Sequence, residues 1–152
     1  MDPAAHGMNL GEISRKTKVA AMREEIVSNK RMGKIALVTG ASRSIGAAIA
    51  KRLAADSAAV ALTYAGAAGA GQEVVRAIET GSRAIAIHAD AADSDSTRAA
   101  VAKTVETFGG LDILVNSAGA VAIAPITEFP SEKFEQMIAV NVRGHRKRLK
   151  TA

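Results

Sequence analysis

The sequence has no cysteine and few aromatic residues, and these deficits exclude several classes of function. Without cysteine, the 152-residue chain has neither a disulfide framework nor a thiolate metal site. Three phenylalanines and one tyrosine leave almost nothing for stacking on nucleic-acid bases. No apolar run reaches the ~18 residues that a membrane span requires. The three histidines, His6, His88 and His145, lie far apart and show no metal-ligand spacing, so we expect no metal site.

The net charge of +5 comes from the two ends of the chain. Between residues 34 and 142, nine Lys and Arg residues are set against eleven Asp and Glu residues. The basic stretch "RGHRKRLK" (143–150) is typical of a solvated terminus, so a nucleic-acid binder is the least favoured reading. Residues 1–33 carry charges where a secretory signal or transit peptide would not. We therefore expect a cytoplasmic protein with no membrane partner.

Apolar residues make up 48% of the chain and charged residues 23%, which suits one compact domain with a sizeable core. Four short, almost continuous apolar runs occupy residues 34–40, 58–63, 84–90 and 111–116. Such runs are typical of strands buried on both faces of a parallel sheet. The sequence therefore predicts four parallel strands.

Stretches with helical periodicity follow each of these runs. They are Ser44–Ala55, Gly71–Thr80, the segment from Asp93 to Phe108, and a stretch that starts at Ser131 after Pro130. Strands alternating with helices predict an α/β fold, a Rossmann-like doubly wound parallel sheet, truncated after about four strands. The expected strand order is 3-2-1-4. The fourth strand is then an exposed edge, through which the protein can self-associate.

Residues 1–33 do not join this alternation. Val19, Met22 and Ile26 can line one side of a helix, but the stretch is short and otherwise polar. We expect a loosely ordered leader, with a docking helix as the alternative. Residues 145–152 form a basic tail.

The turn "TGASRSIG", Thr39 to Gly46, joins the first strand directly to the first helix. Free backbone N–H groups and the positive end of the helix dipole suit an anionic diphosphate at such a turn. Gly40 permits the sharp turn, and Gly46 lets the helix lie close to the sheet. Ser44 stands where a middle glycine is usual; its hydroxyl can donate to a phosphate, but its Cβ makes a positive φ costly. The alternative is a βα turn whose small residues only pack.

Later segments extend this pattern in order: "HAD" at 88–90, "LDILVNSAG" at 111–119 and "VNVRG" at 140–144. Together with the glycine turn, they resemble the short-chain dehydrogenase/reductase family, in particular reductases that act like 3-oxoacyl-carrier-protein reductase. The resemblance covers roughly Lys34 to Gly144. It implies that residues 34–144 form the dinucleotide-binding half of a Rossmann domain.

The resemblance also implies roles for individual residues. Asp90 matches the acid that family members direct at the adenine amino group, with a simple loop cap as the alternative. Asn141 matches the asparagine of the catalytic tetrad, with an ordinary backbone-bonded asparagine as the alternative. Ser117 departs from the family's N-N-A-G motif. The implied cofactor-binding residues are Gly40, Ser42, Arg43, Ser44, Ile45, Gly46, Asp90, Asn116, Ala118 and Gly119.

The expected cofactor is NADP(H) rather than NAD(H). NAD-specific sites of this shape present an acid about 20 residues beyond the glycine turn, where it holds the ribose 2′-hydroxyl. Here the second strand ends in "LTYAGAAG" (62–69), which has no acid. Arg43 supplies a cation that can pair with a 2′-phosphate, although it can also point into solvent.

The family's catalytic serine and Tyr-x-x-x-Lys have no counterpart in this chain. Tyr64 is the single tyrosine, and Ala68 stands four residues later. A carbonyl or alcohol substrate is therefore expected only if the missing half is supplied. The leading hypothesis is an NADP(H)-dependent oxidoreductase represented by its cofactor-binding half and inactive alone. The alternative is a non-catalytic dinucleotide-binding module. The abrupt change of sequence after Gly144 fits a fragment, a change of reading frame or a short protein equally well.

Overall fold

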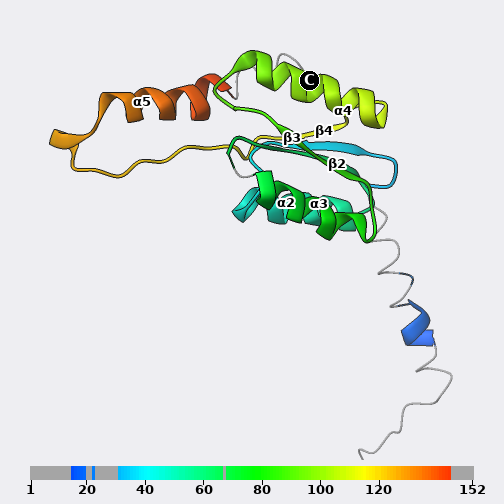
Figure 1. Ribbon diagram of the computed structural model, residues 1–152. Helices are drawn as coiled ribbons and strands as arrows, with labels where there is room; N and C mark the ends of the chain where they lie inside the picture. Colours follow the sequence, from blue (N-terminus) through cyan, green and yellow to red (C-terminus); the bar gives the residue numbers. More distant parts are fainter. Residues whose placement is uncertain (1–14, 20–21, 23–30, 67, 145–152) are drawn as a thin grey trace, which may run out of the picture.

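The computed structural model describes residues 15–19, 22, 31–66 and 68–144. Its centre is a four-stranded parallel sheet in the order β3-β2-β1-β4 (Figure 1). The strands are β1 (Ile35–Val38), β2 (Ala59–Tyr64), β3 (Ala84–His88) and β4 (Ile113–Val115). The predicted fold class and strand order are both confirmed.

Helices cover both faces of the sheet (Figure 1). On one side lie α2 (Ser44–Ala55) and α3 (Ala68–Glu79), and on the other lies α4 (Ser94–Phe108). The α3 helix begins three residues earlier than predicted, because its first turn, Ala68 to Ala70, carries no apolar periodicity. The predicted start of α4 is confirmed: the Asp93 carboxylate accepts hydrogen bonds from the N–H groups of Asp95 (3.0 Å) and Ser96 (3.2 Å).

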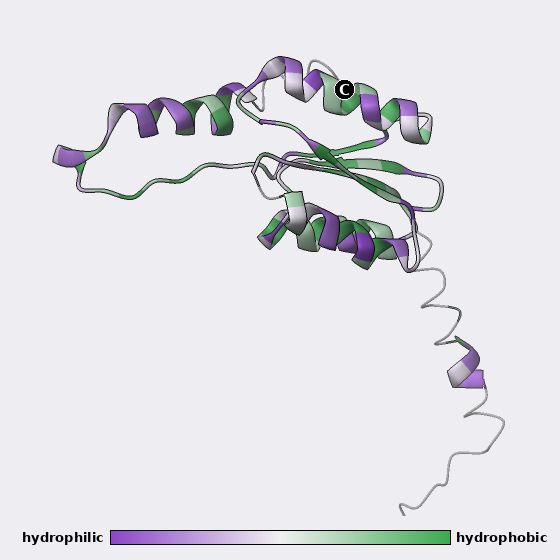
Figure 2. Ribbon diagram, viewed as in Figure 1, coloured by the Kyte–Doolittle hydropathy of each residue, from purple (hydrophilic) through white to green (hydrophobic). Residues whose placement is uncertain are grey.

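The two central strands carry the core. Every residue of β1 is buried, as are the first five of β2, and alternate side chains enter opposite faces of the sheet. Val38, Val60 and Leu62 pack towards α2 and α3, whereas Leu37 packs towards α4 with Val101. Figure 2 shows hydrophobic residues along the strands between the two layers of helices. The edge strands β3 and β4 are only partly buried, which differs from the prediction for all four strands. Each lacks a neighbouring strand on one side within the described residues.

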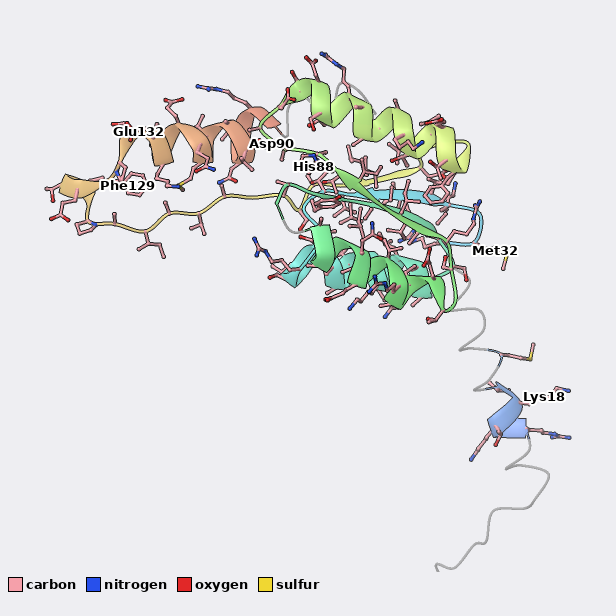
Figure 3. The ribbon with its side chains drawn as sticks, in the orientation of Figure 1. Lys18, Met32, His88, Asp90, Phe129 and Glu132 are labelled. Atoms are coloured by element: carbon pink, nitrogen blue, oxygen red, sulfur yellow. The ribbon has the colours of Figure 1, made fainter. Side chains whose placement is uncertain are left out.

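A long arm follows β4 and projects from the sheet (Figure 1). It runs through a 3₁₀ turn, η1 (Ile126–Glu128), into α5 (Ser131–Ile138) and ends in a π-helical turn, η2 (Ala139–Arg143). Figure 3 shows Phe129 and Glu132 at its far end. No residue of α5 is buried. The start of α5 was predicted, but no pattern in the sequence indicated the π turn.

Both ends of the chain lie largely outside the described residues. Residues 15–19 are helical and exposed. The rest of the leader up to residue 30, apart from residue 22, and the basic tail 145–152 lie outside the described ranges, so the division at residues 33 and 144 stays a prediction. None of the helices in the described part of the chain has the length and apolar character needed to cross a membrane.

A carboxylate ties the start of β1 to the loop before β4. Lys34 Nζ donates to Asp112 Oδ1 (2.8 Å), and the Ile35 N–H donates to Asp112 Oδ2 (2.9 Å). These two donors hold the pKa of Asp112 below its usual value of 3.8. Because the folded-state pKa is lowered, the resulting stability is complete above the usual pKa and is lost as the pH falls through the lowered value.

We predict that Asp112→Asn lowers the urea midpoint of unfolding modestly at pH 7, because an exposed ion pair contributes little. The difference in urea midpoint between the variant and the wild type should narrow as the pH falls below 3.8, because Asp112 then becomes protonated in the wild type as well. Glu106→Gln is the control, because among the described residues Glu106 pairs with Lys103 alone, on the surface of α4. Equal midpoints for Asp112→Asn and the wild type at pH 7 would contradict this assignment.

Candidate dinucleotide site

The turn between β1 and α2 is held by both neighbouring strands. The Thr39 N–H donates to the Val115 carbonyl of β4 (2.9 Å). On the other side, the Ala41 N–H donates to the Thr63 carbonyl (2.9 Å) and the Gly40 N–H to Thr63 Oγ1 (3.1 Å). The turn is therefore anchored at the carboxyl ends of β2 and β4. Sequence analysis missed the anchoring role of Thr63, because it depends on a contact between neighbouring strands.

Both glycines of the turn occupy positions where a side chain has no room. Gly40 has φ +64°, and a Cβ there would lie 2.6 Å from the Cα of Ala118. A Cβ on Gly46 would lie 2.8 Å from the Gly40 carbonyl oxygen and 2.9 Å from the Cα of Ala41. The sharp turn predicted at Gly40 and the close approach predicted at Gly46 are thus present.

Thr39 connects the turn to the loop that follows β4. Its buried hydroxyl accepts hydrogen bonds from the N–H groups of Ser117 and Ala118, each at 3.1 Å, and donates to the Val115 carbonyl (3.4 Å). One threonine therefore fixes the position of the "NSAG" segment relative to the glycine turn. Ser117 takes part through its backbone, which explains why a serine is accommodated there.

The strand ends and these loops enclose a cleft of about 550 Å³. Of the predicted cofactor-binding residues, those that line it are Gly40, Ser42, Arg43, Ser44, Ile45, Gly46, Asp90, Ala118 and Gly119. Asn116 does not line it. The lining also includes residues that the sequence analysis missed: Thr63, Tyr64, Ala65, Gly66, Ala89, Ala91, Ser117, Ala120, Gln136 and Val140. Most of them lie at or just past the carboxyl ends of β2, β3 and β4, which is the signal that could have found them. Gln136 and Val140 come instead from α5 and η2, which the sequence does not place beside the sheet.

Ser44, the first residue of α2, has a left-handed backbone with φ +51°. This conformation costs a non-glycine residue about 1–2 kcal/mol. The side chain is exposed and lines the cleft. The backbone at Ser44 therefore keeps the conformation expected of a glycine, and this lowers the stability of the fold.

Arg43 precedes α2 in an extended conformation (φ −160°). Its side chain is exposed and makes no ion pair with any residue in the described ranges. It lines both the cleft and an adjoining groove between α2 and α3, which Lys51 and Glu73 also line. The guanidinium is available to an anion at either place.

Asp90 lies just past β3, close to His88 (Figure 3). Its Oδ1 accepts from the Ala92 N–H (2.8 Å), and its own N–H donates to Ser96 Oγ (3.1 Å). The carboxylate thus closes a local turn and also lines the cleft. His88 Nε2–H donates to the Ala65 carbonyl (2.8 Å), and its ring packs edge-on against Tyr64. His88 therefore links the ends of β2 and β3.

Asn141 lies in the π turn η2 and uses its amide group on the loop after β4. Its Oδ1 accepts from the Ala120 N–H and its Nδ2 donates to the Ala120 carbonyl, each at 2.9 Å. This pair of bonds holds the end of the arm against the cleft. Both bonds are to backbone groups, as expected if Asn141 is an ordinary backbone-bonded asparagine. The backbone belongs to the loop after β4 and not to the helix that carries Asn141. A catalytic role for Asn141 stays a prediction.

Across the described ranges, no group of three or more histidine, aspartate and glutamate side chains is placed to hold a metal ion. The cleft itself is lined by backbone amides, hydroxyls, Arg43 and Asp90. These are groups that recognise phosphates and hydroxyls.

We predict that Gly40→Ala destabilises the fold by about 2–4 kcal/mol, because it adds a steric clash to the cost of a positive φ. Gly33 is a matched control: it has φ +75° but nothing within 4 Å of its Cβ position. Gly33→Ala should cost only about 1–2 kcal/mol. Urea unfolding of both variants measures the difference, and equal losses would show that the approach to Ala118 is not limiting.

Comparison with known proteins places these features in a family. The model of the short chain dehydrogenase family matches residues 34–152. An uncharacterized oxidoreductase of Methylorubrum extorquens is 45% identical over 117 residues, which are 76% of this chain and 47% of that protein.

Two solved structures are similarly related. A dehydrogenase/reductase from Sinorhizobium meliloti is 49% identical with a TM-score of 0.80, over 85% of this chain and 52% of that one. A short chain dehydrogenase from Burkholderia cenocepacia, solved in complex with NADP, is 50% identical with a TM-score of 0.79, over 82% of this chain and 51% of that one. The chain thus spans about half the length of these relatives. It belongs to the short-chain dehydrogenase/reductase family.

Proposed function

We propose that the cleft binds a nicotinamide dinucleotide, with the diphosphate at the N-terminus of α2. The observation that carries this proposal is a set of free amides: the N–H groups of Ser44, Ile45 and Gly46 have no hydrogen-bond acceptor among the described residues. These amides lie at the positive end of the helix dipole and border the cleft. Oriented N–H groups of this kind form a ready anion site.

The remaining residues of the cleft suit the other parts of the ligand. Ala118 and Gly119 leave room for a ribose, as the family's motif implies. Asp90 retains Oδ2 for an adenine amino group, since Oδ1 is the oxygen bonded to Ala92. Asn116 lies outside the lining. In a protein that also has the catalytic residues, such a cofactor would exchange a hydride between its nicotinamide and a carbon atom of the substrate.

We further propose that NADP(H) is preferred to NAD(H). The end of β2 offers Thr63, Tyr64, Ala65 and Gly66 to the cleft, none of which is an acid able to hold a 2′-hydroxyl. Arg43 has no acidic partner among the described residues and is free to pair with a 2′-phosphate. The similar protein from Burkholderia cenocepacia was solved with NADP, which supports this preference.

Arg43→Gln tests the preference directly. We predict that it weakens NADPH binding about tenfold and leaves NADH binding unchanged, because a charge-assisted bond to the 2′-phosphate is lost. Isothermal titration calorimetry with both cofactors measures the two affinities. Arg76→Gln, on the exposed face of α3 away from the cleft, is the control. Equal weakening of NADPH and NADH, or no weakening, would contradict the assignment of Arg43.

The described half is proposed to bind cofactor without catalysing hydride transfer alone. Tyr64 is the single tyrosine of the sequence, with Ala68 in place of a lysine four residues on, and its ring packs against His88. A non-catalytic dinucleotide-binding module fits the same observations. Oxidation of NADPH with carbonyl substrates, followed by absorbance, should show no turnover by the purified chain. Turnover above the uncatalysed rate would contradict this part of the proposal.

Self-association through the exposed edge strand β4 stays a prediction, and we propose that the arm contributes a second surface to it. The arm exposes Val121, Ile123 and Ile126 at 81%, 96% and 91% of their surface, and β4 is an edge of the described sheet. Burial of such side chains favours association. Sedimentation velocity should show a dimer that Ile123→Asp with Ile126→Asp converts to a monomer. A monomeric wild-type chain would contradict it.

A cytoplasmic location also stays a prediction. So does the absence of nucleic-acid binding, because the basic residues 145–150 lie outside the described ranges.

A further inference from the structure

Ser44 is an unusual residue for its backbone conformation. Among the described residues other than glycine, only Ser44 (φ +51°) and Ser57 (φ +69°) have a positive φ. The two serines flank opposite ends of α2, about 18 Å apart along the helix axis. Such strained positions persist where the surrounding structure determines them, and they cluster at sites that clamp ligands.

The glycines on either side of Ser44 make close backbone contacts. Gly46 is pressed against Gly40 and Ala41, and Gly40 is pressed against Ala118. Ser44 lies between these two close approaches and has a left-handed backbone in a structure that contains no ligand. A glycine there would meet the backbone requirement without a Cβ.

The hydroxyl of Ser44 is not used within the described structure. It makes no hydrogen bond to any residue of the described ranges, whereas the hydroxyls of Thr39 and Thr63 are both bonded to backbone groups. The side chain is exposed and lines the cleft beside the free amides of Ser44, Ile45 and Gly46. A donor is therefore free at the place where the proposed function puts an anion.

We propose that the Ser44 hydroxyl donates a hydrogen bond to an oxygen of the dinucleotide's diphosphate, adding a side-chain donor to the backbone amides. This inference rests on the proposed function of the cleft. Ser44 carries both the hydroxyl and one of the free amides, so the two donors reach the same anion. The 2′-phosphate falls instead to Arg43, which also borders the adjoining groove. Ser44 is thus an affinity-determining residue for both NADPH and NADH.

The test uses Ser44→Ala, which keeps the Cβ and removes only the hydroxyl. We expect the dissociation constants for NADPH and NADH, measured by calorimetry, each to rise about tenfold, because a hydrogen bond to a charged group is lost. Ser57→Ala is the matched control: it has the same left-handed backbone at the other end of the helix and should bind both cofactors as the wild type does. Unchanged affinities for Ser44→Ala would overturn the inference. So would a loss confined to NADPH, since that would assign the hydroxyl to the 2′-phosphate.

Ser44→Gly distinguishes the effect of the hydroxyl on cofactor binding from the effect of the left-handed backbone on stability. Without cofactor, we expect its melting temperature to rise by about 2–4 °C, because the left-handed backbone no longer carries a Cβ. Its affinities should fall as those of Ser44→Ala do, although the fold is more stable. Tighter binding than the wild type would overturn the inference, because it would show that the side chain obstructs the diphosphate. If the folded wild-type chain binds neither NADPH nor NADH, the proposed function itself is wrong.

Discussion

The close approach of the β1–α2 turn to the loop after β4 is the constraint on which the site depends. A Cβ on Gly40 would lie 2.6 Å from the Cα of Ala118, so the two backbones lie directly against one another at this point. Thr39 bonds the same loop through its hydroxyl, and Thr63 holds the turn from the opposite strand. Because these contacts are internal to the protein, the free amides at the start of α2 are positioned before any ligand arrives. Preorganised donors of this kind bind an anion without the cost of ordering a loop.

The turn and the arm, on two sides of the cleft, are held to different degrees. Gly46 lies close against Gly40, and the residue two positions before it, Ser44, has a left-handed backbone. The arm is held less firmly: Asn141 bonds the backbone of Ala120, but no residue of α5 is buried. The side of the cleft formed by the β1–α2 turn is therefore held by internal hydrogen bonds, and the side facing the arm is built from exposed segments.

Much of the fold was predictable from the sequence because its signals are local. Apolar runs marked the strands, Asp93 marked the start of α4, and Gly40 marked the turn. What the sequence could not predict depends on contacts between distant segments. The bonds of Thr39 to the loop after β4, the anchoring role of Thr63 and the π turn around Asn141 join residues 21 or more positions apart. The left-handed conformation of Ser44 was also not predictable, because serine rarely adopts a positive φ.

Mapping of the NADPH complex by nuclear magnetic resonance tests the central claim most directly. The ¹⁵N-labelled chain is titrated with NADPH, and the backbone amide signals are followed. The account predicts the largest shifts at Ser44, Ile45 and Gly46, whose N–H groups have no acceptor among the described residues, with smaller shifts at Ala118 and Gly119 across the cleft. Shifts confined to other surfaces, or none in a folded chain at millimolar NADPH, would contradict it.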